Sequence, residues 1–232
     1  IDNTVPTIIS FTSTTADGSY KSTGTVNITA TASEAVVSGN TITVILDTGD
    51  SILLTAAANG TTLVGTYTVS SADTSSDLTV SSFSIGTVTD SAGNAMTSTA
   101  VPATNIATGS AIVIDTTAPT VISFTSSSDD GLYDDKPGTN NVNITATASE
   151  AVVSGNTITV TLDTGATVVL TAPANGTTLV GTYTVVAGNN SSDLTVSSFI
   201  IGTVTDSAGN AMSSNTLPAT NIDTDSDIVI ST

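Results

Sequence analysis

The chain of 232 residues contains no cysteine, histidine, arginine, tryptophan or glutamine. Without cysteine and histidine it can form no disulfide bond, no thiolate or imidazole metal site, and no nucleophilic triad that depends on either residue. Without arginine it lacks the planar clamp that binds phosphate groups at two points. We therefore expect neither zinc nor copper, whereas hard cations bound through oxygen remain open.

Positive charge is also scarce, because Lys21 and Lys136 stand against 20 acidic residues and leave a net charge of -18. Nucleic acids and anionic membranes bind basic surfaces, so we expect neither as a partner. No apolar run approaches the roughly 18 residues of a membrane span and no signal peptide is visible, so we expect no direct membrane insertion. The hydrophobic content of 38% indicates a globular protein.

Most of the sequence is present twice. The segments 26–44, 59–69 and 85–96 recur unchanged 116 residues later, as 142–160, 175–185 and 201–212. A three-residue insertion between Gly131 and Val142 reduces the upstream offset to 113. This period is too long for a stacked solenoid unit and matches a self-sufficient domain. We predict two domains, 1–114 and 115–232. Because Ile1-Asp2 matches Ile114-Asp115, we interpret the chain as a segment of a longer protein or as a mature fragment.

Each repeat alternates polar and apolar residues with a period of two, and threonine, valine and isoleucine dominate the alternating runs. Gly-, Asn- and Asp-rich turn signals separate these runs, and no stretch shows helical spacing. Seven short antiparallel strands at this spacing predict an all-β, immunoglobulin-like β-sandwich for each repeat. In the first repeat the expected strands are 5–12, 26–33, 41–47, 51–56, 61–70, 78–89 and a last strand ending at 111–115.

Three aromatic residues are expected to fill the core of the first repeat in place of the Cys-Trp-Cys set of antibody domains. They are Phe11, Tyr67 and Phe83, and their counterparts are Phe124, Tyr183 and Phe199. Within 78–89 the apolar residues change parity, which predicts a β-bulge near Ser81-Ser82.

In this topology the second and sixth strands return to the end of the domain where the chain begins. Asp2, Glu34, Asp90 and Asn94 should therefore meet at that end, as should the corresponding residues Asp115, Glu150, Asp206 and Asn210 at the domain junction. Crowded carboxylates repel one another unless a cation lies among them, and Ca²⁺ takes six to eight oxygen ligands. We predict calcium at these positions. The alternative is that the acids only solvate loop ends, with Asp90 and Asn94 shaping an Asx turn.

Other acidic residues are weaker candidates. Asp17, Asp130 and Asp134 are secondary candidates for calcium, although acidic residues in such loops more often only contact solvent. The run from Asp223 to Asp227 alternates like the start of an EF-hand loop but lacks the following glycine and distal glutamate, so we interpret it as a solvated acidic run.

Several motifs carry a family resemblance. The segment from Ile114 to Thr120 (IDTTAPT), the segment Ser149-Glu150-Ala151-Val152 and the segment from Val204 to Asn210 (VTDSAGN) resemble the bacterial immunoglobulin-like repeats of giant surface adhesins and biofilm-associated proteins, as does Asp130-Gly131-Leu132-Tyr133. The resemblance covers essentially the whole chain. It implies extracellular extender regions of the cell surface, commonly rigidified by calcium at the linkers. By position it assigns calcium ligation to Asp2 and Asp115, Glu34 and Glu150, and Asp90 and Asp206. Ser231 departs from the pattern, because it stands where a third linker aspartate would fall.

Three functional hypotheses follow. The leading one is a pair of structural extender repeats of a secreted adhesin, whose partners are the neighbouring repeats of the same chain. The second is a self-associating subunit of an extracellular filament or surface layer, which would need an uncharged edge strand such as Thr41 to Leu46. A carbohydrate-binding module ranks last, because the usual aromatic platform is missing. We expect no enzyme: paired carboxylates can hydrolyse glycosides, but no pocket-lining aromatics accompany them here.

Overall fold

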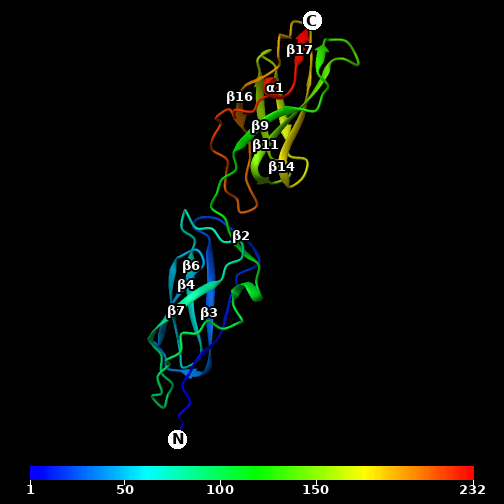
Figure 1. The fold of residues 1–232 in the computed structure, drawn as a ribbon. Helices are drawn as coiled ribbons and strands as arrows, with labels where there is room; N and C mark the ends of the chain where they lie inside the picture. Colours follow the sequence, from blue (N-terminus) through cyan, green and yellow to red (C-terminus); the bar gives the residue numbers. More distant parts are fainter. The chain divides into compact units, whose positions relative to one another are not determined.

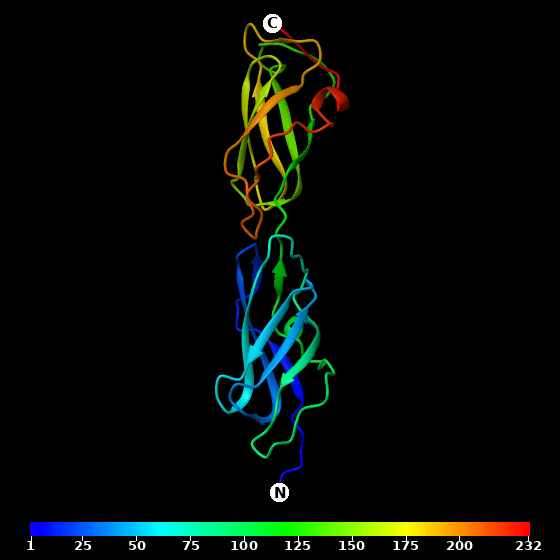
Figure 2. The same ribbon diagram turned by 90° about the vertical axis from the view of Figure 1, so that its left-hand side faces the viewer.

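The computed structural model describes residues 1–232 and is almost entirely β-structure (Figure 1, Figure 2). The chain divides into two compact units, Ile1–Thr116 and Thr117–Thr232, each with its own hydrophobic core. We call these units the first and the second repeat, and each is a β-sandwich-like domain. The helical turns span only three and four residues, so neither is able to cross a membrane as a helix.

In the first repeat, six strands form one curled antiparallel sheet in the order β1-β3-β6-β5-β4-β7. The last strand, β8, pairs in parallel with the short strand β2 and forms a separate two-stranded sheet. The elements are β1 (Ile8–Thr12), β2 (Gly18–Tyr20), β3 (Thr25–Val36), β4 (Thr41–Leu46), β5 (Ser51–Thr55), β6 (Gly60–Thr68), β7 (Val80–Thr87), the 3₁₀ turn η1 (Ile106–Thr108) and β8 (Ile112–Ile114).

The second repeat has the same plan. Its curled sheet has the order β16-β12-β13-β14-β11-β9, and a smaller sheet has the order β10-β17-β15, in which β10 and β17 are parallel. The elements are β9 (Val121–Ser126), β10 (Gly131–Tyr133), β11 (Asn141–Val152), β12 (Thr157–Leu162), β13 (Thr167–Thr171), β14 (Gly176–Thr184), β15 (Asn190–Ser191), β16 (Val196–Ile201), the short helix α1 (Ile222–Asp225) and β17 (Ile228–Ser231).

The alternating sequence explains the long strands. In β3 the residues Val26, Ile28 and Ala30 are fully buried, while the polar residues between them lie on the other face. The predicted all-β sandwich is confirmed. β2, β10 and β15 were not predicted from the sequence, because they have only two or three residues and show no alternation of polar and apolar residues. The parallel pairing of β2 and β10 with the last strand of their repeats was not predicted either.

The expectation that Thr41–Leu46 forms an edge strand is wrong. This strand, β4, forms a hairpin with β5 on one side and pairs with β7 on the other. Both of its edges are therefore hydrogen-bonded within the sheet. The predicted bulge is confirmed: Ile45 pairs with Ser82 and Leu46 pairs with Val80, so Ser81 is the additional residue. The outer strands of the sheet are β1 and β7.

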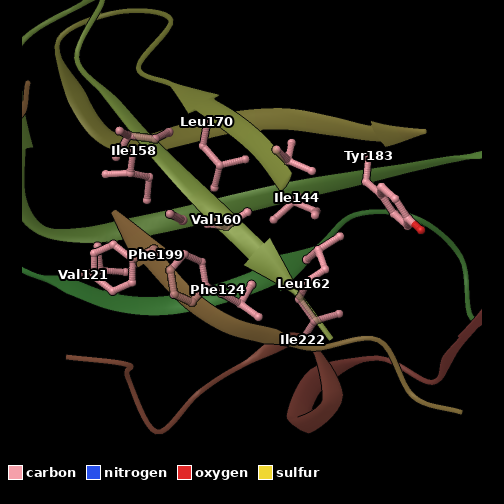
Figure 3. Packing of buried hydrophobic residues seen from close by; sticks show 14 of the residues in the cluster. Val121, Phe124, Ile144, Ile158, Val160, Leu162, Leu170, Tyr183, Phe199 and Ile222 are labelled. Carbon is pink, nitrogen blue, oxygen red and sulfur yellow. The ribbon is translucent and has the colours of Figure 1, made fainter. Parts of the chain in front are cut away.

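Aromatic residues fill the centre of each core as predicted. Phe11 and Phe83 meet edge to face, with ring centroids 5.6 Å apart. Figure 3 shows the equivalent pair in the second repeat, Phe124 and Phe199, whose centroids are 5.5 Å apart. The hydroxyl group of Tyr183 points away from this cluster, as Figure 3 also shows. Edge-to-face rings gain attraction beyond the burial of their area, which favours one packing of the core.

An irregular segment, residues 97–105, forms hydrogen bonds with both outer strands of the first sheet, β1 and β7. Its Thr104 oxygen accepts a hydrogen bond from Phe11 N on β1 (3.0 Å). The Asn105 side chain accepts from Val80 N on β7 (3.0 Å) and donates to Val80 O (2.9 Å). This segment, which we call the strap, therefore satisfies backbone groups on both edges. In the second repeat, Thr220 and Asn221 make the same contacts with Phe124 and Val196.

Candidate metal centre

Three of the predicted ligands of the first repeat, Asp2, Glu34 and Asp90, come together in space. Each offers one carboxylate oxygen, and the three oxygens lie within 4.8 Å of one another. Asp115, Glu150 and Asp206 meet the same limit. These two groups are the only sets of three or more acidic side chains with this spacing in the chain. We call them the first and the second acidic triad.

The sheet places Glu34 beside Asp90. Glu34 lies near the end of β3, where Val36 forms an antiparallel bridge with Asp90. The next residue, Val37, donates its N–H to Thr89 O at 3.0 Å. Two residues before this bridge the Glu34 side chain is only half-buried. The end of β3 thus presents a carboxylate next to the loop that follows β7.

Asp2 reaches the group because the leading segment of the chain is tied to the same end of β3. Ser33 N donates to Thr7 O at 2.8 Å, and Thr7 N donates to Ser33 Oγ at 3.0 Å. Nearer the chain start, Thr4 N donates to Asp2 Oδ1 at 3.0 Å. Asp2 itself remains exposed. Residues 1–7 therefore carry the most accessible carboxylate of the triad.

Asp90 is the buried member, with 4% of its surface exposed. Asn94 holds it through two hydrogen bonds, from the backbone N to Oδ1 (2.8 Å) and from Nδ2 to Oδ2 (2.7 Å). Asn94 Nδ2 also donates to the Asp2 backbone oxygen at 3.2 Å. Asn94, which the sequence predicted as a ligand, thus contacts the triad through its amide nitrogen and orients Asp90 and Asp2.

The three carboxylates of the first triad lie close enough for their negative charges to repel one another. Burial, followed by repulsion from Asp2 and Asp90, raises the pKa of Glu34 above its ordinary value. Glu34 Oε1 is buried and has no hydrogen-bond partner. In contrast, the hydrogen bond from the Asn94 side chain lowers the pKa of Asp90. A cation among the three oxygens would offset the repulsion and give Glu34 Oε1 a partner.

The second repeat repeats the local construction. Asn210 N donates to Asp206 Oδ1 at 2.8 Å, and Asn210 Nδ2 donates to Asp206 Oδ2 at 2.7 Å. Asp206 is buried, with 3% of its surface exposed. Thr120 and Ser149 form the same pair of hydrogen bonds as Thr7 and Ser33.

The secondary candidates do not join any such group. Asp17 Oδ1 accepts from Ala111 N at 2.9 Å, and Asp130 Oδ1 accepts from Asp227 N at 3.0 Å, so each carboxylate fixes the start of the last strand of its repeat. Asp134 caps a turn in the loop specific to the second repeat, where it accepts from Lys136 Nζ at 2.5 Å. These contacts account for the three residues without a metal.

The acidic run from Asp223 to Asp227 lies on and after α1 and, with Asp130, lines a polar hollow of about 180 Å³. Burial, followed by repulsion from Asp223 and Asp227, raises the pKa of Asp193 in the same repeat. The sequence did not single out Asp193, because it approaches the run only through the pairing of distant segments. The counterparts of Asp223 and Asp227 in the first repeat are Ala107 and Ala111.

Each triad offers only oxygen atoms to a metal ion, because three carboxylates converge in it. Such a donor set suits a hard divalent cation. A scan of protein-family models and a search of curated proteins gave no match to this chain.

Proposed function

We propose that the chain consists of two calcium-binding structural repeats that serve as extender modules of a secreted bacterial surface adhesin. The observation that supports this best is the two acidic triads, whose members occupy corresponding positions in the duplicated sequence. The buried and unpartnered Glu34 Oε1 adds to it, because a native protein rarely leaves such an atom without a hydrogen bond or an ion.

Calcium fits the triads better than other divalent ions. Zinc and copper favour imidazole and thiolate ligands, and this chain has neither histidine nor cysteine. Magnesium requires a near-ideal octahedron and keeps several waters, whereas calcium accepts irregular sets of carboxylate and backbone oxygens. Extracellular modules bind calcium with dissociation constants of about 0.1–1 mM, so the sites would fill outside the cell and remain empty in the cytosol.

The placement of Asp2 suggests what the ion does. Asp2 belongs to the leading segment, whereas Glu34 and Asp90 belong to the body of the sandwich. A calcium ion shared by the three side chains would fasten the segment that leads into the repeat to its body. Asp115 has the same place in sequence before the second repeat. The proposed function is therefore to hold successive repeats of one chain in a fixed relation and so project an adhesive region from the cell surface, as in biofilm formation.

The test is a calorimetric titration of the chain with calcium, compared with the Glu34→Gln and Glu150→Gln variants. We expect two sites in the unmodified chain and one in each variant, with Asp129→Asn as the control because Asp129 is an exposed acid outside the triads. At 10 mM calcium each filled site should stabilise its repeat by about 1.4–2.7 kcal/mol. A chain that binds no calcium at 10 mM, or variants that bind as many ions as the control, would show that the triads are not the sites.

Small-angle scattering then distinguishes the extender hypothesis from the filament hypothesis. The extender hypothesis expects a monomer of fixed dimensions in calcium that becomes flexible with chelator. Growth into long particles would instead support the filament hypothesis. That alternative has lost its expected edge strand, because β4 is interior. The outer strand β7 has bulges at Ser81 and Gly86, and such bulges disfavour pairing between sheet edges.

A further inference from the structure

A hollow of about 310 Å³ lies on the solvent-facing side of β3 and β6 in the first repeat. The side chains that line it include Thr14, Asn27, Thr29, Val64 and Thr66. The second repeat has a hollow of about 280 Å³ at the corresponding positions, with Ser127, Asn143, Thr145, Val180 and Thr182. Where Thr14 is replaced by Ser127, the hydroxyl group is retained.

The polar groups of the hollow are held in place before any ligand arrives. Asn27 and Thr66 are directly opposite each other on β3 and β6, and Thr66 Oγ1 donates to Asn27 Oδ1 at 3.2 Å. The equivalent bond from Thr182 Oγ1 to Asn143 Oδ1 is 3.0 Å long. Because the amide oxygen is engaged by the threonine, the amide nitrogen is the group that Asn27 offers to a ligand.

The chemistry of the lining selects the ligand class. No charged side chain lines either hollow, while amide and hydroxyl groups supply both donors and acceptors. Val64 adds an apolar surface beside them, and 46% of it is exposed. The net charge of -18 disfavours phosphates, sulfated glycans and acidic peptides. A neutral sugar ring combines hydroxyl groups on its rim with an apolar C–H face, and one ring fits within about 300 Å³.

We propose that each hollow binds one neutral sugar residue of a glycan. Its hydroxyl groups would hydrogen-bond to Asn27, Thr29 and Thr66, and its C–H face would pack on Val64. Without an aromatic platform each site would be weak, with a dissociation constant on the order of millimolar. Two nearly identical sites in one chain would raise the avidity for a polymeric glycan. The proposal concerns a different face from the acidic triads and does not rest on calcium binding.

The test is a titration of the ¹⁵N-labelled chain, followed by NMR, with the methyl glycosides of glucose, galactose, mannose and N-acetylglucosamine, each to 100 mM. We expect at least one probe to shift the amides of Thr29 and Thr66 and their counterparts, and glucuronate to shift them less. The double variant Thr66→Val with Thr182→Val should bind that probe about five- to tenfold more weakly, which corresponds to the loss of one hydrogen bond per site.

The control is the double variant Thr62→Val with Thr178→Val, because both residues are exposed on the same strands but outside the hollows. Both double variants keep β-branched side chains at exposed strand positions, so the fold is retained. The proposal is overturned if no probe shifts these amides at 100 mM. It is also overturned if both double variants bind the probe as well as the unmodified chain, or if both lose binding equally.

Discussion

Replacing Asn105 by alanine tests whether the strap closes the sandwich of the first repeat. The Asn105 side chain accepts hydrogen bonds from Val80 N and Ile106 N, at 3.0 and 2.8 Å, and donates to Val80 O at 2.9 Å. Val80 is only 2% exposed, so water reaches its backbone poorly once the amide is removed. The substitution therefore removes the side-chain partner of three backbone groups, Val80 N, Val80 O and Ile106 N, all in buried residues.

The expected loss of stability follows from these bonds. A typical hydrogen bond contributes about 1 kcal/mol, and leaving a buried backbone group unpaired costs about 1–3 kcal/mol. Because a truncated side chain admits some water, we take a total of about 3 kcal/mol. For a domain of this size about 1 kcal/mol corresponds to roughly 4 °C, so the first repeat should melt about 12 °C lower.

The second repeat is an internal reference for this measurement. Its sequence nearly duplicates the first, and Asn221 makes the same contacts with Val196. In differential scanning calorimetry we expect Asn105→Ala to split the unfolding into two transitions, of which only one has moved. Asn221→Ala should move the other by a similar amount, and Thr99→Ala, an exposed strap residue, should move neither by more than about 2 °C.

The reasoning would be refuted if Asn105→Ala melted within about 2 °C of the unmodified chain. The strap would then be a passive covering, and other contacts would close the gap between β1 and β7. A uniform shift of both repeats would also contradict it, since the bonds in question lie entirely within the first repeat.

Three further outcomes are expected. Gly65→Ala should destabilise the first repeat by about 1–3 kcal/mol in urea unfolding, because the new Cβ would lie 2.5 Å from a backbone oxygen of β5, whereas Gly109→Ala meets open space. Burial, followed by a hydrogen bond to Asp73, raises the pKa of Tyr67 above its ordinary 10.0. The neutral Tyr67 side chain therefore contributes its full stabilisation of the first repeat below pH 10, and this contribution is lost as the pH rises further. Between pH 9 and 12 the melting temperature of the first repeat should therefore fall less steeply with pH in the Tyr67→Phe variant than in the unmodified chain. Hydrogen bonds, first from Lys136, lower the pKa of Asp134 to about 2; Lys136→Ala should raise it measurably in an NMR titration.

The long strands and the core were predictable from sequence because both depend on local alternation. The parity change within 78–89 even located the bulge at Ser81, since a bulge leaves its trace in the order of residues along one strand. The neighbours of each strand were harder to predict. The uncharged composition of β4 predicts an edge strand, but strand order is decided by segments far apart in the chain.

The acidic triads were predictable as groups of residues, because chain direction alone sends the ends of β3 and β7 to the same end of the domain. The role of Asn94 was not, since sequence does not say which atom of an amide faces a carboxylate. Asp193 escaped notice for a related reason. Its acidic neighbours, Asp223 and Asp227, are about thirty residues away in the chain and approach it only in the folded repeat.

The parallel pairing of β2 with β8 bears on how a repeat responds when its two ends are pulled apart. β8 is bonded along both sides: Asp115 N donates to Tyr20 O, and Leu78 N donates to Ile112 O. Tension that enters through the N-terminal side of β2 and leaves through the C-terminal end of β8 acts along these strands. Because the two strands are parallel, this tension shears all of the hydrogen bonds between them at once. It does not break them one after another. The last strand is short, but its geometry resists tensile rupture better than its length suggests.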